Sequence, residues 1–379
     1  MTDSHMKSPR TNSLSSPLQL GSLSVHNRIF MAPLTRCRAG GGHQPNALML
    51  EYYRQRAGAG LIIAEATMVM EGGSTYIAEP GIYSAAQVAG WRSITDAVHA
   101  AGGRIFLQLW HGGRTCHPLL NDGRQPVAPS ALAIEGALTH TREGKKPHAV
   151  PRALADDELP GIVAAFKSAA ANAKDAGFDG VEVHGANGYL LDEFLRDGSN
   201  RRTGPYGGSV ENRARLMLDV LAAVREVWGA QRVGLRLSPL NSFNDMRDSD
   251  PVGLCVWLAQ RLNDFDLAYL HVMRGDFLGR QTGDVLGSIR QHYKGVLIGN
   301  MGYTADEAER AIGDGVIDAV AFGAGFLANP DLPVRIQAGA PWNQPVPAKF
   351  YTPGPEGYTD YPTLAQCPSV HVDRAPGPA

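Results

Sequence analysis

Short apolar runs recur along the chain, and polar or glycine-rich stretches separate them. Eight runs have the length and composition of buried strands; they cover residues 29–32, 60–64, 104–109, 180–183, 233–237, 268–272, 296–299 and 319–322. Between most of them the apolar positions repeat with helical spacing, over residues 86–100, 160–176, 211–227, 251–262 and 305–313. Strands that alternate with helices imply a parallel sheet, and eight such units predict an α/β protein with a single (β/α)8 TIM barrel.

The two ends of the chain differ in composition from its middle. Residues 1–16 are rich in Ser, Pro, Thr and Asn and predict a disordered segment, and the Pro-rich residues 363–379 predict a mobile tail. Residues 17–25 indicate a short β-hairpin with its turn at Gly21-Ser22, which would form a lid on one end of the barrel. The barrel domain is therefore expected to span residues 17–362.

A long insert follows the third predicted strand. Residues 112–152 show no periodicity and contain five prolines, so they predict a loop with little regular structure. In a barrel this loop opens on the catalytic face, where the carboxyl ends of the strands meet. Two roles are open for it there, a lid over the site or an inert surface insertion.

Composition and charge narrow the class of protein. With 44% hydrophobic residues and 44 glycines among 379 residues, the chain can bury a sizeable core and make many tight turns, which indicates a soluble globular protein. Its formal net charge of -2 gives no basic footprint for nucleic acid or an anionic membrane. We expect no membrane span and no secretory signal. The four cysteines form no Cys-x-x-Cys pair, which predicts reduced cytoplasmic thiols and no metal site.

Polar residues gather where the predicted strands end. Thr35 and Gln108 are hydrogen-bonding groups that taken alone are ordinary strand-end residues, whereas Arg236 lies in an apolar strand and would be costly to bury without an acceptor. His184 and Tyr189 follow the fourth strand within six residues. No cluster of carboxylates or histidines has metal-ligand spacing, and nothing resembles an activated Ser-His-Asp set. A set of neutral hydrogen-bond donors around one fixed positive charge would suit a ligand that is a planar polar heterocycle.

The segment after the fourth strand carries the most informative motif. It reads His184-Gly185-Ala186-Asn187-Gly188-Tyr189, and Asp197-Gly198-Ser199-Asn200 and the stretch 206–213 follow it. This ordered set resembles the signature of the old yellow enzyme family, flavin-dependent ene-reductases built on a (β/α)8 barrel. Further segments that are similar to the family appear in order from about residue 18 to residue 362.

The resemblance implies roles for individual residues. It places FMN, held noncovalently, on the hydrogen-bonding side chains of Thr35, Gln108 and Arg236, with backbone or packing contacts from Pro33 and Ala66. A flavin needs such donors along its pyrimidine edge and a positive charge near N1 and O2.

Substrate contacts follow from the same resemblance. His184 and Asn187 would hold the carbonyl or nitro oxygen of the substrate, and one helical turn between them could aim both side chains the same way. Tyr189 would protonate the α-carbon, since a phenol is protonated at neutral pH. Aromatic side chains would form the walls of the substrate pocket; they are Tyr76, Trp110, Phe243 and Tyr351.

Two glycine turns on the last two strands are candidates for the phosphate of FMN. One contains Gly299, Asn300 and Gly302, and the other contains Gly323 and Ala324. Backbone N–H groups of such turns bind phosphate in many barrels. The family pattern has an arginine where Ala324 stands, so we expect weaker FMN binding here than that pattern implies.

The resemblance implies an NADPH- or NADH-dependent enzyme that reduces the C=C bond of α,β-unsaturated carbonyl or nitro compounds. Because nicotinamide and substrate would stack on the same flavin face, ping-pong turnover is expected. Two alternatives remain at this point: reduction of nitrate esters or nitroaromatics, and a catalytically silent barrel that binds a ligand. The expected partners are small activated alkenes, with no nucleic acid and no membrane, and the chain would be a monomer or a homodimer. Two roles are open for the basic residues of the insert: they could bind the 2′-phosphate of NADPH, or they could simply be exposed to solvent. These residues are Arg114, Arg124, Arg142, Lys145 and Lys146.

Overall fold

The computed structural model describes residues 13–367 and confirms the predicted barrel. Eight parallel strands close on themselves in the order β10-β11-β12-β13-β14-β3-β4-β5. Their bounds are Ile29–Met31 (β3), Ile62–Met68 (β4), Ile105–Trp110 (β5), Gly180–Gly185 (β10), Val233–Leu237 (β11), Tyr269–Met273 (β12), Leu297–Asn300 (β13) and Ala319–Phe322 (β14). Every residue of these strands is buried, which is why they read in the sequence as continuous apolar runs.

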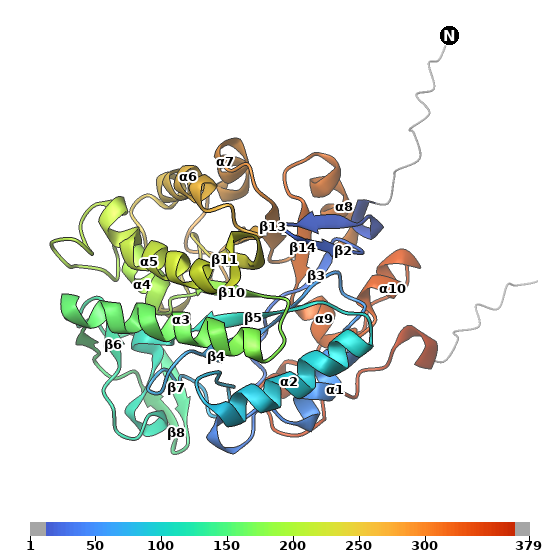
Figure 1. Ribbon diagram of the computed structural model, residues 1–379, viewed down its shortest axis with the longest axis horizontal. Helices are drawn as coiled ribbons and strands as arrows, with labels where there is room; N and C mark the ends of the chain where they lie inside the picture. Colours follow the sequence, from blue (N-terminus) through green and yellow to red (C-terminus); the bar gives the residue numbers. More distant parts are fainter. Residues whose placement is uncertain (1–12, 368–379) are drawn as a thin grey trace, which may run out of the picture.

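Helices surround the barrel and cover its outer face (Figure 1). They are Ala47–Gln55 (α1), Ala85–Ala100 (α2), Leu159–Asp175 (α3), Leu190–Leu195 (α4), Val210–Trp228 (α5), Pro251–Leu262 (α6), Val285–His292 (α7), Ala305–Gly313 (α8), Ala324–Ala328 (α9) and Leu332–Gln337 (α10). Side-chain caps start several of them: Ser84 forms a capping box on α2, and Ser209 accepts from the Asn212 N–H on α5. The five helices predicted from periodicity are thus present, to within one residue at each end.

Short 3₁₀ turns join these elements. In the described part of the chain they are Ser13–Ser15 (η1), Gly41–His43 (η2), Gly113–Thr115 (η3), Pro118–Leu120 (η4), Asp156–Glu158 (η5), Ala230–Arg232 (η6), Phe243–Asp245 (η7), Asn263–Phe265 (η8), Pro347–Lys349 (η9) and Leu364–Gln366 (η10).

The predicted N-terminal hairpin closes the end of the barrel at which the strands begin. It consists of β1 (Leu18–Leu20) and β2 (Leu23–Val25), joined by the Gly21-Ser22 turn. Its apolar side chains pack in one cluster with Phe30, Phe106 and Tyr269 of the barrel interior. The hairpin is therefore a plug that lies opposite the face where barrel sites form.

Both expected chain-end segments extend into the described region. Residues 1–12 and 368–379 lie outside the described residues. Within the expected disordered segment, however, Ser13–Ser15 form a 3₁₀ turn in which Leu14 is buried and donates its N–H to Glu309 of α8 at 3.0 Å. At the other end, Leu364–Gln366 also form a 3₁₀ turn.

The long insert contains more regular structure than its prolines predicted. An antiparallel hairpin, β7 (Leu138–Thr141) and β8 (Gly144–Pro147), and a two-residue parallel pair, β6 (Val127–Ala128) and β9 (Arg152–Ala153), replace the expected irregular loop. Burial alternates along β7, with Thr139 and Thr141 inside, so the hairpin is a half-buried ribbon rather than a free loop. The prolines did not prevent these short strands, because Pro126 and Pro151 come just before β6 and β9, and Pro147 is the last residue of β8, where it stands opposite Leu138.

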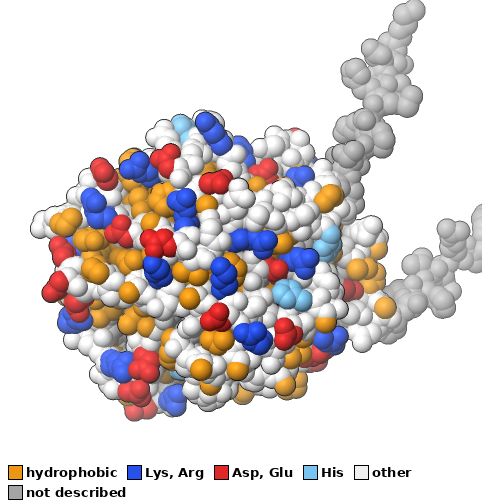
Figure 2. Space-filling view, in the orientation of Figure 1, with side chains coloured by type: hydrophobic (Ala, Val, Ile, Leu, Met, Phe, Trp, Pro, Cys, Tyr) orange, Lys and Arg blue, Asp and Glu red, His pale blue; other side chains and the backbone are white. Residues whose placement is uncertain are grey.

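The face of the molecule in Figure 2 carries basic and acidic side chains interspersed over helices α2, α3 and α5, without a patch of one sign. Among the described residues, no helix has both the length and the apolar character that a bilayer span requires.

Candidate active site

The register of the barrel brings the predicted polar residues together. His184 on β10 pairs with Arg236 on β11, and Arg236 pairs in turn with His271 on β12. On the other side, Gln108 of β5 pairs with Glu182 of β10. Neighbours at one level of a parallel barrel point to the same interior, so these side chains share one volume near the carboxyl ends of the strands.

Arg236 is the buried cation of this group. Its side chain is 6% exposed, and among the described residues it makes one side-chain hydrogen bond, from Nη2 to Asn300 Oδ1 at 2.9 Å, and no ion pair. Its Nε is buried without a partner. Burial lowers the pKa of this guanidinium. A buried guanidinium with an unused donor calls for an electron-rich acceptor, which the carbonyl edge of an isoalloxazine ring would provide.

A hydrogen-bond chain that sequence reasoning missed lies beside Arg236. Gln108 Nε2 donates to Glu182 Oε1 at 2.7 Å, and His271 Nδ1 donates to Glu182 Oε2 at 2.9 Å. Burial lowers the pKa of His271, so its ring is neutral despite this carboxylate. This hydrogen-bond chain orients the Gln108 amide, and no donor among the described residues reaches its oxygen. A glutamate inside the apolar run of residues 180–183 was the signal for it, because a lone charge in a buried strand needs partners.

His184 is held as a neutral donor. It is 3% exposed, and its Nδ1 accepts the backbone N–H of Ala186 at 3.3 Å, which leaves the ring proton on Nε2. Burial lowers the pKa of His184 well below its usual value, and the Arg236 and His271 side chains act in the same direction. The ring is therefore uncharged at neutral pH and presents one N–H donor.

Asn187 does not reach the site by the predicted helical turn. It lies in the left-handed region with φ 60°, in the tight turn between β10 and α4, and Gly188 follows with φ 73°. A side chain at Gly188 would meet Met246 and Asn244 within 3 Å, so the turn requires glycine there. Asn241 donates to Asn187 Oδ1 at 2.9 Å, and the Asn187 amide N–H groups have no partner in the described part of the chain.

Tyr189 lies at the centre of an aromatic cluster. Its ring meets the rings of Trp110 and His184 edge-on, with centroids 5.1 and 5.2 Å away. Its hydroxyl is 2.9 Å from the Tyr76 hydroxyl. Burial raises the pKa of Tyr189, so its phenol keeps its proton throughout the neutral range.

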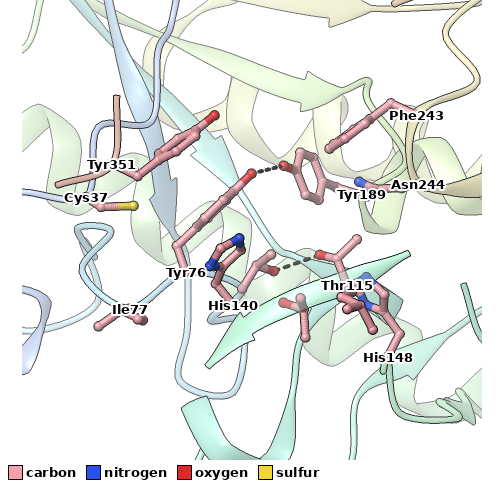
Figure 3. Close-up of a pocket in the computed structure, with 13 residues that line it drawn as sticks. Cys37, Tyr76, Ile77, Thr115, His140, His148, Tyr189, Phe243, Asn244 and Tyr351 are labelled. Carbon is pink, nitrogen blue, oxygen red and sulfur yellow. Dashed lines mark hydrogen bonds between the residues drawn. The ribbon is translucent and has the colours of Figure 1, made fainter. Parts of the chain in front are cut away.

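A pocket of about 390 Å³ opens above this cluster (Figure 3). Four predicted residues line it, namely Tyr76, Tyr189, Phe243 and Tyr351. Trp110, His184 and Asn187 lie behind these residues rather than in the lining itself. Sequence reasoning missed the remaining lining residues, which are Cys37, Thr75, Ile77, Thr115, Leu138, Thr139, His140, His148 and Asn244. Most of them come from the insert and from loops that have no periodic pattern.

The remaining predicted contacts lie at the ends of β3 and β4. Pro33 is buried, and the Thr35 side chain is half-buried and makes no hydrogen bond with residues 13–367. Ala66 packs in one cluster with Trp110 and Tyr189. The free hydroxyl of Thr35 and the small side chain of Ala66 are compatible with the flat edge of a flavin in the volume below Tyr189.

The two glycine turns form a second hollow of about 330 Å³. Gly302, Gly323 and Ala324 line it, whereas Gly299 packs on Tyr303 and Asn300 turns toward Arg236. The first N–H groups of α9 have no partner within the helix and are donors for a phosphate. None of the lining residues is Lys or Arg. A backbone cradle thus fits a phosphate group, but it lacks a cation.

The Arg274 guanidinium, which lies beside Gly302, does not supply that charge. Arg274 donates to Met301 O and Gly302 O at 2.9 and 3.1 Å and pairs with Glu307 at 2.6 Å. All its nitrogens are therefore engaged in holding the turn. Within residues 13–367, no three His, Cys, Asp or Glu side chains are arranged to hold a metal ion.

Basic residues of the insert are not one solvated group. Arg114 is buried, and its guanidinium donates to Leu132 O, Asn244 O and Asp245 O. It connects the insert to the loop after β11 and is not available for a nucleotide phosphate. Arg124 pairs with Glu71 at 3.0 Å.

Fold and site together define a barrel oxidoreductase of the flavin-binding class. Residues 13–343 match the NADH:flavin oxidoreductase / NADH oxidase family, and the chain belongs to this family. The resemblance to old yellow enzymes is thereby confirmed.

Individual relatives agree with this assignment. A probable flavin mononucleotide-dependent alkene reductase of Leishmania infantum is 51% identical over 353 residues, which cover 92% of this chain and 96% of that protein. The old yellow enzyme structure from Trypanosoma cruzi superimposes with a TM-score of 0.91 at 46% identity and covers 93% of this chain and 99% of its own. Morphinone reductase in complex with tetrahydroNAD gives a TM-score of 0.89 at 49% identity and covers 93% and 98%.

Proposed function

We propose that this oxidoreductase uses noncovalently bound FMN and NADH or NADPH to reduce the C=C bond of α,β-unsaturated carbonyl or nitro compounds. The observation that carries the proposal is the position of the protonated Tyr189 phenol, which lines the pocket together with three other aromatic rings and lies beside the neutral donor His184. A proton donor next to hydrogen-bond donors suits addition of hydride and proton across a polarised double bond.

Two donors would bind the substrate oxygen. His184 offers its Nε2–H, and Asn187 offers amide N–H groups because its oxygen is occupied by Asn241. Negative charge grows on the carbonyl or nitro oxygen as hydride reaches the β-carbon, and donors fixed in advance stabilise that charge. The neutral state of His184 also avoids a second buried cation next to Arg236.

Tyr189 would give its proton to the α-carbon. The hydrogen bond with Tyr76 holds the phenol in place, and Tyr76 can pass a proton on to it from the pocket side. The rings of Tyr76 and Tyr351 stack with centroids 6.1 Å apart and form one wall of the pocket. Flat conjugated substrates fit such walls better than saturated ones do.

The chain would hold FMN through residues at the strand ends. Thr35, the Gln108 amide and Arg236 would bind the ring edge, with Pro33 and Ala66 packing against it. Gly302, Gly323 and Ala324 would cradle the phosphate. The bound cofactor would accept hydride from the nicotinamide and deliver it to the alkene.

The test is an anaerobic absorption spectrum recorded before NADPH, after NADPH and after 2-cyclohexenone. Flavin bands that bleach with NADPH and return with the enone, together with cyclohexanone as product, are expected. Bleaching without return on the enone would refute alkene reduction and leave the nitro or nitrate-ester alternative, which needs no proton from Tyr189. The silent-barrel alternative is set aside, because the chain belongs to an oxidoreductase family.

A further inference from the structure

The interior of the barrel holds a buried positive and a buried negative charge near the proposed flavin site. Arg236 is 6% exposed, and Glu182 is fully buried. Burial lowers the pKa of the Arg236 guanidinium, and the Glu182 carboxylate acts in the opposite direction. While the flavin ring is oxidised and uncharged, these two charges balance each other.

Reduction of the flavin would disturb this balance. Hydride transfer to the ring brings two electrons and one proton, and the added negative charge lies at N1 and O2, on the side of Arg236. Two negative charges would then face one positive charge in a buried volume. A buried charge without a partner costs free energy, so reduction should favour the binding of a proton nearby.

His271 of β12 has a nitrogen that can take this proton. Its Nδ1 lies 2.9 Å from Glu182 Oε2 and carries the ring proton, because a carboxylate cannot donate. Its Nε2 is buried and has no hydrogen-bond partner among residues 13–367. In a neutral ring this second nitrogen carries a lone pair, so protonation there breaks no existing hydrogen bond and places the new charge next to an anion.

His184 lies on the other side of Arg236 and differs in both respects. In the strand register Arg236 pairs with His184 on β10 and with His271 on β12. His184 Nδ1 accepts the Ala186 N–H at 3.3 Å, so a second proton on this ring would break that bond. Within the described part of the chain, no carboxylate forms an ion pair with His184. Of the two histidines, His271 is therefore the better proton acceptor.

The groups around His271 determine when it binds a proton. Burial lowers its pKa, Glu182 of β10 raises it, and Arg236 of β11 lowers it. Two further titratable groups face it, His184 of β10 and Tyr269 of its own strand, and burial keeps both uncharged at neutral pH. Strand β13 contributes an apolar side chain at the paired position. Negative charge on the flavin would offset Arg236 and leave Glu182 to favour the protonated ring.

We infer that His271, held by Glu182, binds one proton from solvent when the bound flavin is reduced and releases it when the flavin is reoxidised. The Glu182–His271 pair is thus a redox-linked proton site, and it places the proton uptake of each turnover in the reductive half-reaction. This inference rests on the proposed binding of FMN beside Arg236.

Protons and electrons balance over the two half-reactions. NADPH gives a hydride to the flavin, and His271 gains one proton. The alkene then takes the hydride at its β-carbon and a proton from Tyr189 at its α-carbon, while Tyr189 regains a proton from solvent and His271 loses one. The sum is the reaction of NADPH, one proton and the alkene to NADP+ and the saturated product.

The experiment follows proton uptake by the holoenzyme with a pH-indicator dye, in weakly buffered anaerobic solution at about pH 7. One equivalent of NADPH is added first and 2-cyclohexenone second, and the flavin absorbance records each half-reaction. Hydride transfer alone consumes no proton. We therefore expect uptake of about one proton per flavin with NADPH and about none with the enone, whereas an enzyme without this site would show the reverse order.

Two histidine variants assign the proton. His271→Asn retains an amide N–H for Glu182 but has no basic nitrogen, and His184→Asn is the matched control on the other side of Arg236. Uptake with NADPH should be lost in His271→Asn and retained in His184→Asn. In a potentiometric titration the midpoint potential should fall with pH about twice as steeply in the wild type as in His271→Asn, since two protons rather than one accompany the two electrons.

Glu182→Gln separates the effect of charge from a loss of packing. Without the carboxylate the reduced site is already neutral, so proton uptake with NADPH should disappear. At about pH 7 the midpoint potential should rise in Glu182→Gln, because Arg236 is unopposed, and fall in His271→Asn, because the reduced state loses its proton. General damage to the site would not move the potential in opposite directions.

Complete reduction of the flavin by NADPH without proton uptake in the wild type would overturn the inference, and this result needs no variant. Uptake that persists in His271→Asn would also overturn it, because the proton would then lie on another group, such as the flavin itself. Failure of NADPH to reduce the flavin would instead refute the proposed function. In that case the pH dependence of the potential, measured with dithionite as reductant, would still test His271.

Discussion

Introducing a cation at the phosphate hollow should separate the contributions of backbone and charge to cofactor binding. Ala324 lines this hollow together with Gly302 and Gly323, and none of the lining residues is basic. Arg274, whose guanidinium lies beside Gly302, is already engaged with Glu307 and two carbonyl groups. In the native chain the phosphate would thus be held by neutral donors, and FMN should exceed riboflavin in affinity only modestly.

The substitution Ala324→Arg adds one charge-assisted contact to the phosphate. Hydrogen bonds to charged groups are worth about 1.5 to 3 kcal/mol, so FMN should bind roughly 10- to 150-fold more tightly. Riboflavin lacks the phosphate, and its affinity should not change. The hollow of about 330 Å³ leaves room for the longer side chain.

The assay is titration of the flavin-free protein with FMN and with riboflavin, followed by quenching of flavin fluorescence. Ala324→Gln is the matched control, because it adds length and hydrogen bonding without charge. The FMN gain in Ala324→Arg should shrink as salt is raised from about 0.05 to 0.5 M. An unchanged FMN-to-riboflavin ratio, or an equal gain in Ala324→Gln, would refute the placement of the phosphate in this hollow.

Three further outcomes follow from the site and its surroundings. Tyr189→Phe should slow alkene reduction about 10²- to 10⁴-fold, as loss of a general acid does, while the rate of flavin reduction by NADPH stays nearly constant in stopped flow; equal slowing of both steps would exclude this role. Arg236→Met should lower the midpoint potential of the bound flavin in a potentiometric titration, because the cation favours the reduced anion; an unchanged potential would contradict the placement of Arg236 at N1 and O2. Burial raises the pKa of Glu193 from 4.5 to about 8. The folded state therefore binds a proton that the unfolded chain has released, and stability should fall as the pH rises from about 4.5 to 8. Urea unfolding should show a flatter pH dependence for Glu193→Gln, and an identical slope would refute the assignment.

Much of the barrel was predictable because parallel strands are buried on both faces. That burial turns each strand into an apolar run, which the chain shows at all eight positions. Candidate residues such as His184 and Arg236 stood out for the same reason, since polar groups at the ends or in the middle of such runs need a partner. The closed register then confirmed that these two side chains are neighbours.

Other parts of the site had no local signal. Tyr351 reaches Tyr76 across 275 positions of the chain, and the rings meet because the segment that follows the barrel packs back on the loop after β3. Arg36 and Arg38 hold that segment through carbonyl groups of Phe350 and Gly357. Long-range contacts to backbone atoms leave no pattern in either stretch of sequence.

The amino-acid sequence by itself determined the eight-stranded barrel, the N-terminal hairpin and the set of neutral donors around one buried cation, because periodicity and buried polarity are local properties. The tertiary structure alone decided that Glu182 joins Gln108 to His271, that Arg274 is unavailable to a phosphate, and that the β7–β8 hairpin places His140 at the pocket mouth. Each of these contacts depends on strand register and on packing, which bring side chains within hydrogen-bond reach of one another. The spacing of residues along the chain does not determine such distances in space.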